Sequence, residues 1–198
     1  MDLETAVRFL ISVFVVGITP VPWWLIIFHY LVRKQSKVIT IVSYASIAIF
    51  WGILGFYVYH HMELLFGQRF TPTWVMRLLG FIVILLAAYM DWKVMQTLGV
   101  KRLLMFVEMK QEKTHEQFVT SGIYQYARHP RYVEYMLIAL SVVLFFGYIF
   151  MFYYLIYLIL SFWLATSAEE KELVERFGND YREYQKKVPR FFIPFRRR

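Results

Sequence analysis

The sequence predicts an all-α integral membrane protein of about five transmembrane helices, with a C-terminal helical hairpin and amphipathic tail helices. Of its 198 residues, 59% are apolar and only 18% are charged, whereas a soluble domain is about 45–50% apolar and about 25% charged. Several apolar stretches approach the roughly 20 residues that a helix needs to cross a bilayer. The basic residues gather in segments between these stretches. A chain this small has too little interior to hide so much apolar surface from water, which argues against a soluble globule.

Five stretches have the length and composition of a span, namely 7–32, 38–59, 73–90, 130–146 and 148–166. The first contains Pro20 and Pro22, which lack backbone donors and predict a kink or a break. Only Gly147 separates the last two stretches. These two are therefore expected to form a tight antiparallel hairpin.

The distribution of basic residues predicts the topology. Nearly all of the 22 lie in segments 33–37 and 91–131 and in the tail from residue 168, the exceptions being Arg8, Arg69 and Arg77. Five spans place the three basic segments on one side of the membrane. The positive-inside rule then puts the N-terminus outside and the C-terminus in the cytoplasm. This arrangement accounts for the net charge of +8 without a nucleic-acid partner.

The predicted cytoplasmic segments are long enough to carry function, and connection 91–129 is long for a structureless loop. In the tail we expect two short amphipathic helices, one over 168–177 and one that ends before Pro189. Gly178 is the expected C-cap of the first, and Asn179 the expected N-cap of the second. The chain has no cysteine and no cluster with metal-ligand spacing, so the sequence predicts neither thiol chemistry nor a metal site.

The hairpin brings together residues that are distant in the sequence. Its two arms are nearly equal in length at ~1.5 Å per residue. Arg128 and His129, just before the first arm, are therefore expected at the level of the residues that follow the second arm. Those residues are Glu169 and Glu170. Two donors and two carboxylates at the membrane–cytosol boundary suit a zwitterionic ligand, whose carboxylate would face Arg128 and the helix N-terminus at Pro130.

These residues lie in recognisable motifs. The run VTSGIYQYARHPRY at 119–132 resembles the "G-x-Y…R-H-P-x-Y" signature of integral membrane methyltransferases. This is the family of isoprenylcysteine carboxyl methyltransferase and the phospholipid methyltransferases. Segment 169–184 resembles its second signature, "E-E-x-x-L…F-G-x-x-Y-x-x-Y", and VPRFFIP at 188–194 resembles its usual ending. The tail motifs are most similar to the isoprenylcysteine carboxyl methyltransferase branch.

The resemblance implies S-adenosylmethionine as methyl donor and a lipophilic acceptor that enters from the bilayer. Carried over by position, the cofactor-binding residues are Gly122, Tyr124, Arg128, His129, Pro130, Tyr132, Glu169 and Glu170. Arg190 is expected to close the site from the tail. Catalytic roles are assigned to Arg128, Glu134 and Arg190.

Glu134 lies about one turn inside the fourth span. Acidic side chains within a membrane are costly, and each is a candidate functional residue. Relatives often have a small residue at this position. One hypothesis makes Glu134 a structural partner of Arg128 or Arg131. The other makes it an orienting group or a base for the substrate headgroup.

The sequence thus predicts one structural domain with two parts. Residues 1–96 form a three-span bundle that shapes substrate choice, and residues 97–198 form the cofactor-binding loop, the hairpin and the tail. The predicted function is S-adenosylmethionine-dependent methylation of a lipophilic acceptor in a membrane that is expected to be prokaryotic. The alternatives are a phospholipid N-methyltransferase, a related NADPH-dependent membrane reductase and a non-catalytic membrane protein. Membrane lipids and the acceptor are the expected partners, and the oligomeric state is left open.

Overall fold

The computed structural model describes residues 2–27, 37–103 and 118–191. Within these residues the regular secondary structure is helical, apart from an isolated antiparallel bridge between Arg69 and Tyr148. The all-α class is therefore confirmed. The helices are α1 (Leu3–Ile18), α2 (Val21–Ile27), α3 (Lys37–His60), α4 (Met62–Phe66), α5 (Trp74–Leu103), the 3-10 helix η2 (Gly122–Gln125), α7 (Pro130–Phe146), α8 (Ile149–Phe177) and α9 (Asn179–Lys187).

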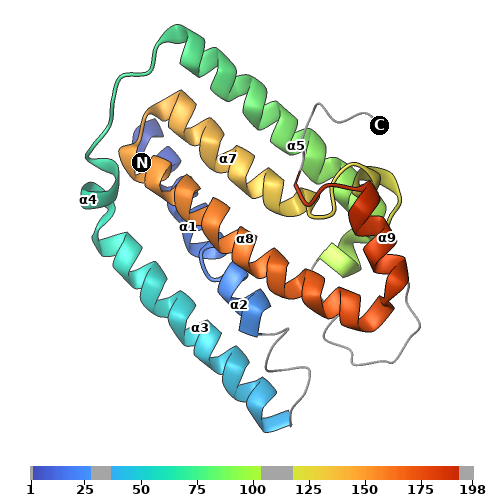
Figure 1. Cartoon of the computed structure of the whole chain (residues 1–198). Helices are drawn as coiled ribbons and strands as arrows, with labels where there is room; N and C mark the ends of the chain where they lie inside the picture. The colour runs from blue at the N-terminus through green and yellow to red at the C-terminus, as the bar shows by residue number, and fades with distance from the viewer. Residues whose placement is uncertain (1, 28–36, 104–117, 192–198) are drawn as a thin grey trace.

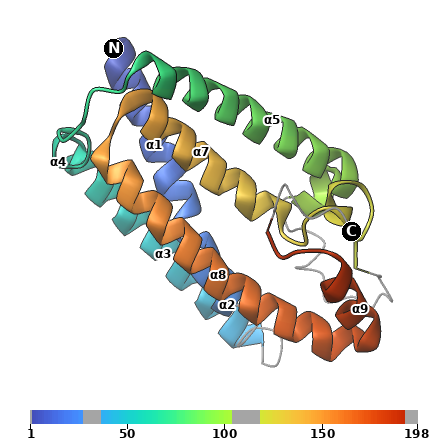
Figure 2. The same cartoon turned by 45° about the horizontal axis from the view of Figure 1, so that its top comes forward.

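The long helices lie side by side in the spatial order α3, α1 with α2, α8, α7, α5 (Figures 1 and 2). A core of buried side chains joins α1, α2, α7 and α8, and it includes Val15, Leu25, Ala139 and Phe162. Helix α5 packs closely on α7 because Gly80 carries no side chain. A Cβ at Gly80 would lie 3.0 Å from the Ser141 carbonyl oxygen. This packing order places the α7–α8 hairpin in the middle of the molecule.

The proline-rich first stretch is broken, as the sequence predicted. Helix α1 ends at Ile18, and α2 starts at Val21 after a turn that contains Pro20. The Thr19 N–H donates to the Val15 carbonyl at 3.0 Å, and the Trp24 N–H donates to the Pro20 carbonyl at 2.8 Å. Backbone hydrogen bonds therefore continue through the break between α1 and α2.

The predicted hairpin is confirmed. Gly147 lies between α7 and α8 in the left-handed region, with φ +74°, and its N–H donates to the Val143 carbonyl at 2.9 Å. A side chain at Gly147 would collide with the Phe70 carbonyl oxygen. Glycine is therefore required at this turn for two independent reasons.

The tail differs in part from the prediction. The separate helix expected over 168–177 is wrong, because α8 runs without interruption to Phe177. No glycine or proline lies between Gly147 and Gly178 to stop it. Gly178 is the C-cap as predicted, but the N-cap of α9 is this same Gly178, and Asn179 is already helical. Helix α9 ends at Lys187, before Pro189, as expected.

Three helical segments among the described residues are long and apolar enough to cross a membrane: Leu3–Ile27, Trp74–Gly99 and Ile149–Phe177. The part of α3 over Ala45–His60 is a shorter apolar helix, and α7 has 17 residues. By length and composition the structure thus gives three of the five predicted spans. Large apolar side chains face outward from these helices, among them Trp74, Phe81 and Trp163, a pattern typical of a surface that contacts membrane lipid.

The two ends of the bundle carry different groups. At one end, Arg8 bonds to Glu4 and Glu63, and the loop before α5 pairs with the hairpin turn. At the other end, α7 begins, α8 becomes polar and α9 folds back (Figure 1). Residues 33–36 of the predicted basic segment 33–37, and residues 104–117 of the segment 91–131, lie outside the described residues.

Candidate functional site

The polar end of the hairpin brings together the residues that the sequence predicted to meet. Helix α8 has 29 residues, about 44 Å at ~1.5 Å per residue, which exceeds the roughly 30 Å of a hydrocarbon core. The apolar part of α8 ends at Ala168, and Glu169 and Glu170 directly follow it. Arg128 and His129, just before α7, both contact Glu170 there.

The Glu170 carboxylate is the centre of this cluster, and its side chain is 4% exposed. Its Oε1 atom lies 2.7 Å from Arg128 Nη2 and 3.0 Å from His129 Nε2. Its Oε2 atom accepts from Arg190 Nη2 at 2.9 Å and from Gln185 Nε2 at 3.1 Å. Burial alone would raise the pKa of Glu170, but hydrogen bonds from His129, Arg190 and Arg128 outweigh it and lower the pKa to about 2. Glu170 is therefore ionised at neutral pH.

The same contacts tie the tail to the start of α7. The Arg128 N–H donates to the Pro189 carbonyl at 2.9 Å, and the His129 N–H donates to the Arg190 carbonyl at 3.1 Å. The Arg128 guanidinium also donates to the Gln185 carbonyl at 3.0 Å and to the Val188 carbonyl. Arg128 thus joins α7, α8 and the chain that follows α9.

Glu169 is the more accessible of the two glutamates, with a side chain 23% exposed. Its Oε2 accepts from the Tyr132 hydroxyl at 3.1 Å and lies 3.5 Å from His129 Nδ1. The Tyr132 ring stacks on Phe162, with centroids 4.6 Å apart. The two adjacent glutamates therefore differ: Glu170 is enclosed by donors, and Glu169 is held at the edge of the cluster.

Arg190 reaches the cluster from the tail and contacts Glu170. Its side chain is 22% exposed, Nη1 donates to the Ser167 hydroxyl at 2.8 Å, and the guanidinium lies 4.8 Å from the Trp163 ring centroid. The Phe191 ring is 6.1 Å from Trp163. Arg190 and Glu169 are thus the partly exposed charges of this region, beside aromatic rings.

Gly122 and Tyr124 belong to the 3-10 helix η2, and contacts outside the Glu170 cluster hold them in place. Gly122 has φ +60°, and a Cβ there would collide with the Thr97 hydroxyl oxygen on α5. The Tyr124 carbonyl accepts from the Tyr184 hydroxyl at 2.5 Å. Burial raises the pKa of Tyr184 to about 12, which keeps this donor protonated at neutral pH. Pro130, the first residue of α7, is fully buried.

Glu134 is buried, 6% exposed, and its Oε2 has no hydrogen-bond partner among the described residues. Arg128, one of its two expected partners, instead contacts Glu170. Ser141 lies two turns further along α7 on the Glu134 face and packs against Gly80 of α5. Because α5 and α7 run antiparallel, this register brings Asp91 of α5 near Glu134, and the charge environment of Glu134 includes both Asp91 and its other expected partner, Arg131.

Sequence reasoning missed three residues of this cluster: Gln185, Ser167 and Trp163. A signal for two of them was present in α8. Trp163, Ser167 and Glu170 are spaced i, i+4 and i+7, so they share one face of the helix. Gln185 follows Tyr184 in the second tail motif, but its partner, Glu170, is 15 residues away in the sequence. The residues around Gln185 do not predict this contact.

The fold and the site define a helical membrane protein with a buried ion-paired cluster where its C-terminal hairpin meets the tail. The chain belongs to the phospholipid methyltransferase family, whose model matches residues 75–180. The matched range contains α7, α8, η2 and every predicted site residue except Arg190. The family resemblance read from the motifs is therefore confirmed.

Two curated relatives match the chain. Methanethiol S-methyltransferase of Crocosphaera subtropica is 27% identical over 180 residues, which cover 87% of this chain and 65% of that protein. Protein-S-isoprenylcysteine O-methyltransferase of Schizosaccharomyces pombe is 38% identical over 84 residues, which cover 42% of this chain and 35% of that protein. The chain thus matches less than two thirds of the length of either relative. No solved structure matches it significantly.

Proposed function

We propose that this protein is an S-adenosylmethionine-dependent methyltransferase that acts on a lipophilic acceptor in the membrane. The observation that carries this proposal is the cluster around Glu170, which assembles α7, α8 and the tail within and just beyond the region matched by the family. Both curated relatives are named as methyltransferases.

The residues at the edge of the cluster fit the chemistry of this cofactor. S-adenosylmethionine carries a carboxylate, an amine, ribose hydroxyls and an adenine ring. Arg190 is a partly exposed cation for the carboxylate, and Glu169 is a partly exposed acceptor for the amine or hydroxyls. Trp163 and Phe191 supply aromatic surface. His129, Tyr132, Gly122, Tyr124 and Pro130 complete the proposed cofactor-binding set.

When bound, S-adenosylmethionine supplies an electrophilic methyl group on a sulfonium. Arg190 and Glu169 orient the ligand. Glu170, itself bonded to Arg128, holds Arg190 in place, and Tyr132 and His129 hold Glu169. Orientation contributes a large part of the acceleration of a displacement reaction. Arg128 acts in this scheme through Glu170 and the tail carbonyls.

The acceptor depends on parts of the chain outside this cluster. The relatives' names give a sulfur acceptor in one case and an oxygen acceptor in the other. A thiolate or carboxylate acceptor needs no strong base, whereas an amine must first lose a proton. The buried Glu134, with Asp91 nearby, favours phospholipid N-methylation as the second candidate function. We assign the choice of acceptor to the N-terminal region, residues 1–96.

The test is a comparison of cofactors on the full chain in detergent micelles, by isothermal titration calorimetry. S-adenosylmethionine should bind and be displaced by S-adenosylhomocysteine, and NADPH should not bind. Binding of NADPH alone would indicate the reductase, and binding of neither would indicate a non-catalytic protein. Transfer of labelled methyl groups to a small thiol, a prenylated cysteine or phosphatidylethanolamine vesicles then identifies the acceptor.

A matched control is available at the same end of the bundle. Arg182 is exposed on α9, and its side chain has no ionic or hydrogen-bond partner among the described residues. Arg182→Ala should leave cofactor affinity unchanged, whereas Arg190→Ala should weaken it at least tenfold. Equal affinity in the two variants would show that Arg190 does not contact the cofactor.

A further inference from the structure

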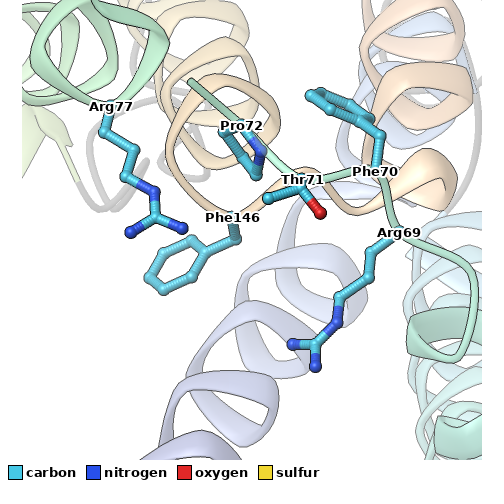
Figure 3. Close-up of a pocket in the computed structure, with 6 residues that line it drawn as sticks. All are labelled: Arg69, Phe70, Thr71, Pro72, Arg77 and Phe146. Carbon is cyan, nitrogen blue, oxygen red and sulfur yellow. The ribbon is translucent and has the colours of Figure 1, made fainter. Parts of the chain in front are cut away.

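A cationic pocket lies at the end of the bundle opposite the Glu170 cluster. It has a volume of about 260 Å³ and is lined by Arg69, Phe70, Thr71, Pro72, Arg77 and Phe146 (Figure 3). These residues come from the loop before α5, the first turn of α5 and the last residue of α7. None of them belongs to the candidate methyltransferase site.

The wall of this pocket is held by backbone contacts. The Phe70 N–H donates to the Gly147 carbonyl at 3.0 Å, and the Ile149 N–H donates to the Gln68 carbonyl at 3.1 Å. The loop therefore pairs with the hairpin turn on both sides of Tyr148, which is 2% exposed. These bonds fix the start of the Arg69 side chain before any ligand binds.

The pocket lining is positively charged and contains no carboxylate. Among the described residues, Arg69 pairs with Glu4 at 3.2 Å, a carboxylate that it shares with Arg8. Arg77 is exposed, and no carboxylate pairs with it among the residues that the structure describes. In Figure 3 the Arg69 and Arg77 side chains come from the two sides of the pocket, with Phe146 between them in this view. Among the described residues, the Arg77 charge is therefore unpaired, and it lines the same pocket as Arg69.

The surroundings of the pocket are those of a membrane interface. Trp74, 77% exposed, begins α5 beside the pocket, and exposed apolar side chains follow it along the helix, including Leu78 and Phe81. Phe145 of α7 is also exposed. Tryptophan is enriched at the boundary between lipid tails and water, and arginine extends its guanidinium toward the headgroups there. A ligand of this pocket would thus meet charge at one end and apolar surface at the other.

We propose that this pocket binds the phosphate group of a membrane lipid, with Arg69 and Arg77 as the cationic ligands and the exposed apolar side chains of α5 and α7 along the acyl chains. Guanidinium groups match the geometry of phosphate oxygens and bind them bidentately. The pocket would hold one lipid at the end of the bundle remote from the Glu170 cluster. This proposal does not depend on methyl transfer.

Native mass spectrometry of the delipidated full chain in detergent tests the proposal. Phosphatidylglycerol should bind, and the variant Arg69→Gln/Arg77→Gln should raise its dissociation constant at least tenfold. Arg182→Gln, at the other end of the bundle, is the matched control and should leave that constant unchanged. Because Arg77 makes no ion pair among the described residues, Arg77→Gln alone should keep the unfolding temperature of the parent while still weakening lipid binding.

Competition with inorganic phosphate tells a site for a lipid phosphate from a site for free phosphate. A lipid site should bind phosphatidylglycerol much more tightly than millimolar phosphate, because the apolar contacts contribute to the lipid alone. Displacement of the lipid by millimolar phosphate would overturn the assignment to a lipid. Equal lipid binding by the double variant and the parent would overturn the site itself. S-adenosylmethionine affinity, measured in parallel, should be the same in both proteins.

Discussion

Arg128 Nη2 lies 2.7 Å from the Glu170 carboxylate, although 42 positions separate the two residues, and both side chains are at least nine-tenths buried. Each partner makes further bonds: Glu170 with His129, Arg190 and Gln185, and Arg128 with tail carbonyls. Removing one member of a buried pair leaves the other charge unpaired and is strongly destabilising. The pair therefore couples the stability of the polar end to the shape of the candidate site.

Glu170→Ala is expected to lower both stability and cofactor affinity. Loss of the carboxylate leaves Arg128 and Arg190 without their shared anion, at a cost of about 3–5 kcal/mol in unfolding free energy. Thermal unfolding in detergent measures the first effect, and calorimetry with S-adenosylmethionine the second, where the dissociation constant should rise at least tenfold. Glu175→Ala, on the exposed part of α8, is the control. An unfolding temperature equal to that of the parent would contradict the central role of Glu170.

Arg128→Ala should have a similar effect on affinity. Loss of a charge-assisted hydrogen bond costs about 1.5–3 kcal/mol, which is a tenfold or greater rise in dissociation constant. Because Arg128 also holds the Gln185 and Val188 carbonyls, the variant should expose the tail to limited proteolysis near residue 188. A tail that stays protected in Arg128→Ala would argue against this coupling.

Glu169→Gln is expected to separate affinity from stability. The Glu169 side chain is partly exposed and accepts from Tyr132, and glutamine keeps an acceptor for that bond. The unfolding temperature should therefore stay within about one degree, while S-adenosylmethionine affinity falls about tenfold through loss of the charge. Calorimetry and thermal unfolding on the same preparation provide both values. Parent-like affinity in Glu169→Gln would remove Glu169 from the proposed cofactor contacts.

Glu134→Gln is expected to slow methyl transfer and to leave S-adenosylmethionine affinity within about twofold. The carboxylate is buried against α5, its Oε2 has no bond among the described residues, and Arg128 contacts Glu170 instead. If the acceptor is an amine, the activity of the parent should fall at low pH as the Glu134 carboxylate is protonated. The Glu134→Gln variant should lack this fall in activity. Asp91→Asn tests the neighbouring acid. Full turnover of Glu134→Gln on the true acceptor would exclude a role in substrate handling.

Gly122→Ala is expected to destabilise the packing of η2 on α5. The backbone has φ +60°, which costs alanine roughly 1–2 kcal/mol, and the new Cβ would collide with Thr97. The double variant Gly122→Ala/Thr97→Ala should recover part of the lost unfolding temperature, because it removes the collision and keeps the backbone strain. Equal unfolding temperatures for the single and double variants would mean that Thr97 does not limit this position.

The topology predicted from the basic residues can be tested with two introduced cysteines, since the chain has none of its own. Gln68 and Lys171 are exposed at opposite ends of the bundle. In intact cells, a membrane-impermeant maleimide should label Gln68→Cys and should reach Lys171→Cys only after the cells are opened. Labelling of both from outside would contradict a cytoplasmic candidate site.

Local signals in the chain were sufficient for much of the fold. The length of the apolar stretches predicted the helices, Pro20 predicted the break between α1 and α2, and Gly147 predicted the hairpin turn. These features depend on one residue and its immediate neighbours. The equal arms of the hairpin then placed Arg128 beside Glu170, because helical rise alone determines that register.

The roles of individual site residues required the packing of distant segments. Glu169 and Glu170 are equivalent in the sequence, but adjacent residues on a helix point about 100° apart. Glu170 faces the returning tail, where Gln185 and Arg190 surround it, and Glu169 faces Tyr132. Likewise, Gly122 is required because Thr97 of α5 lies against it. Neither relation has a local signal, because each depends on where the chain returns after dozens of residues.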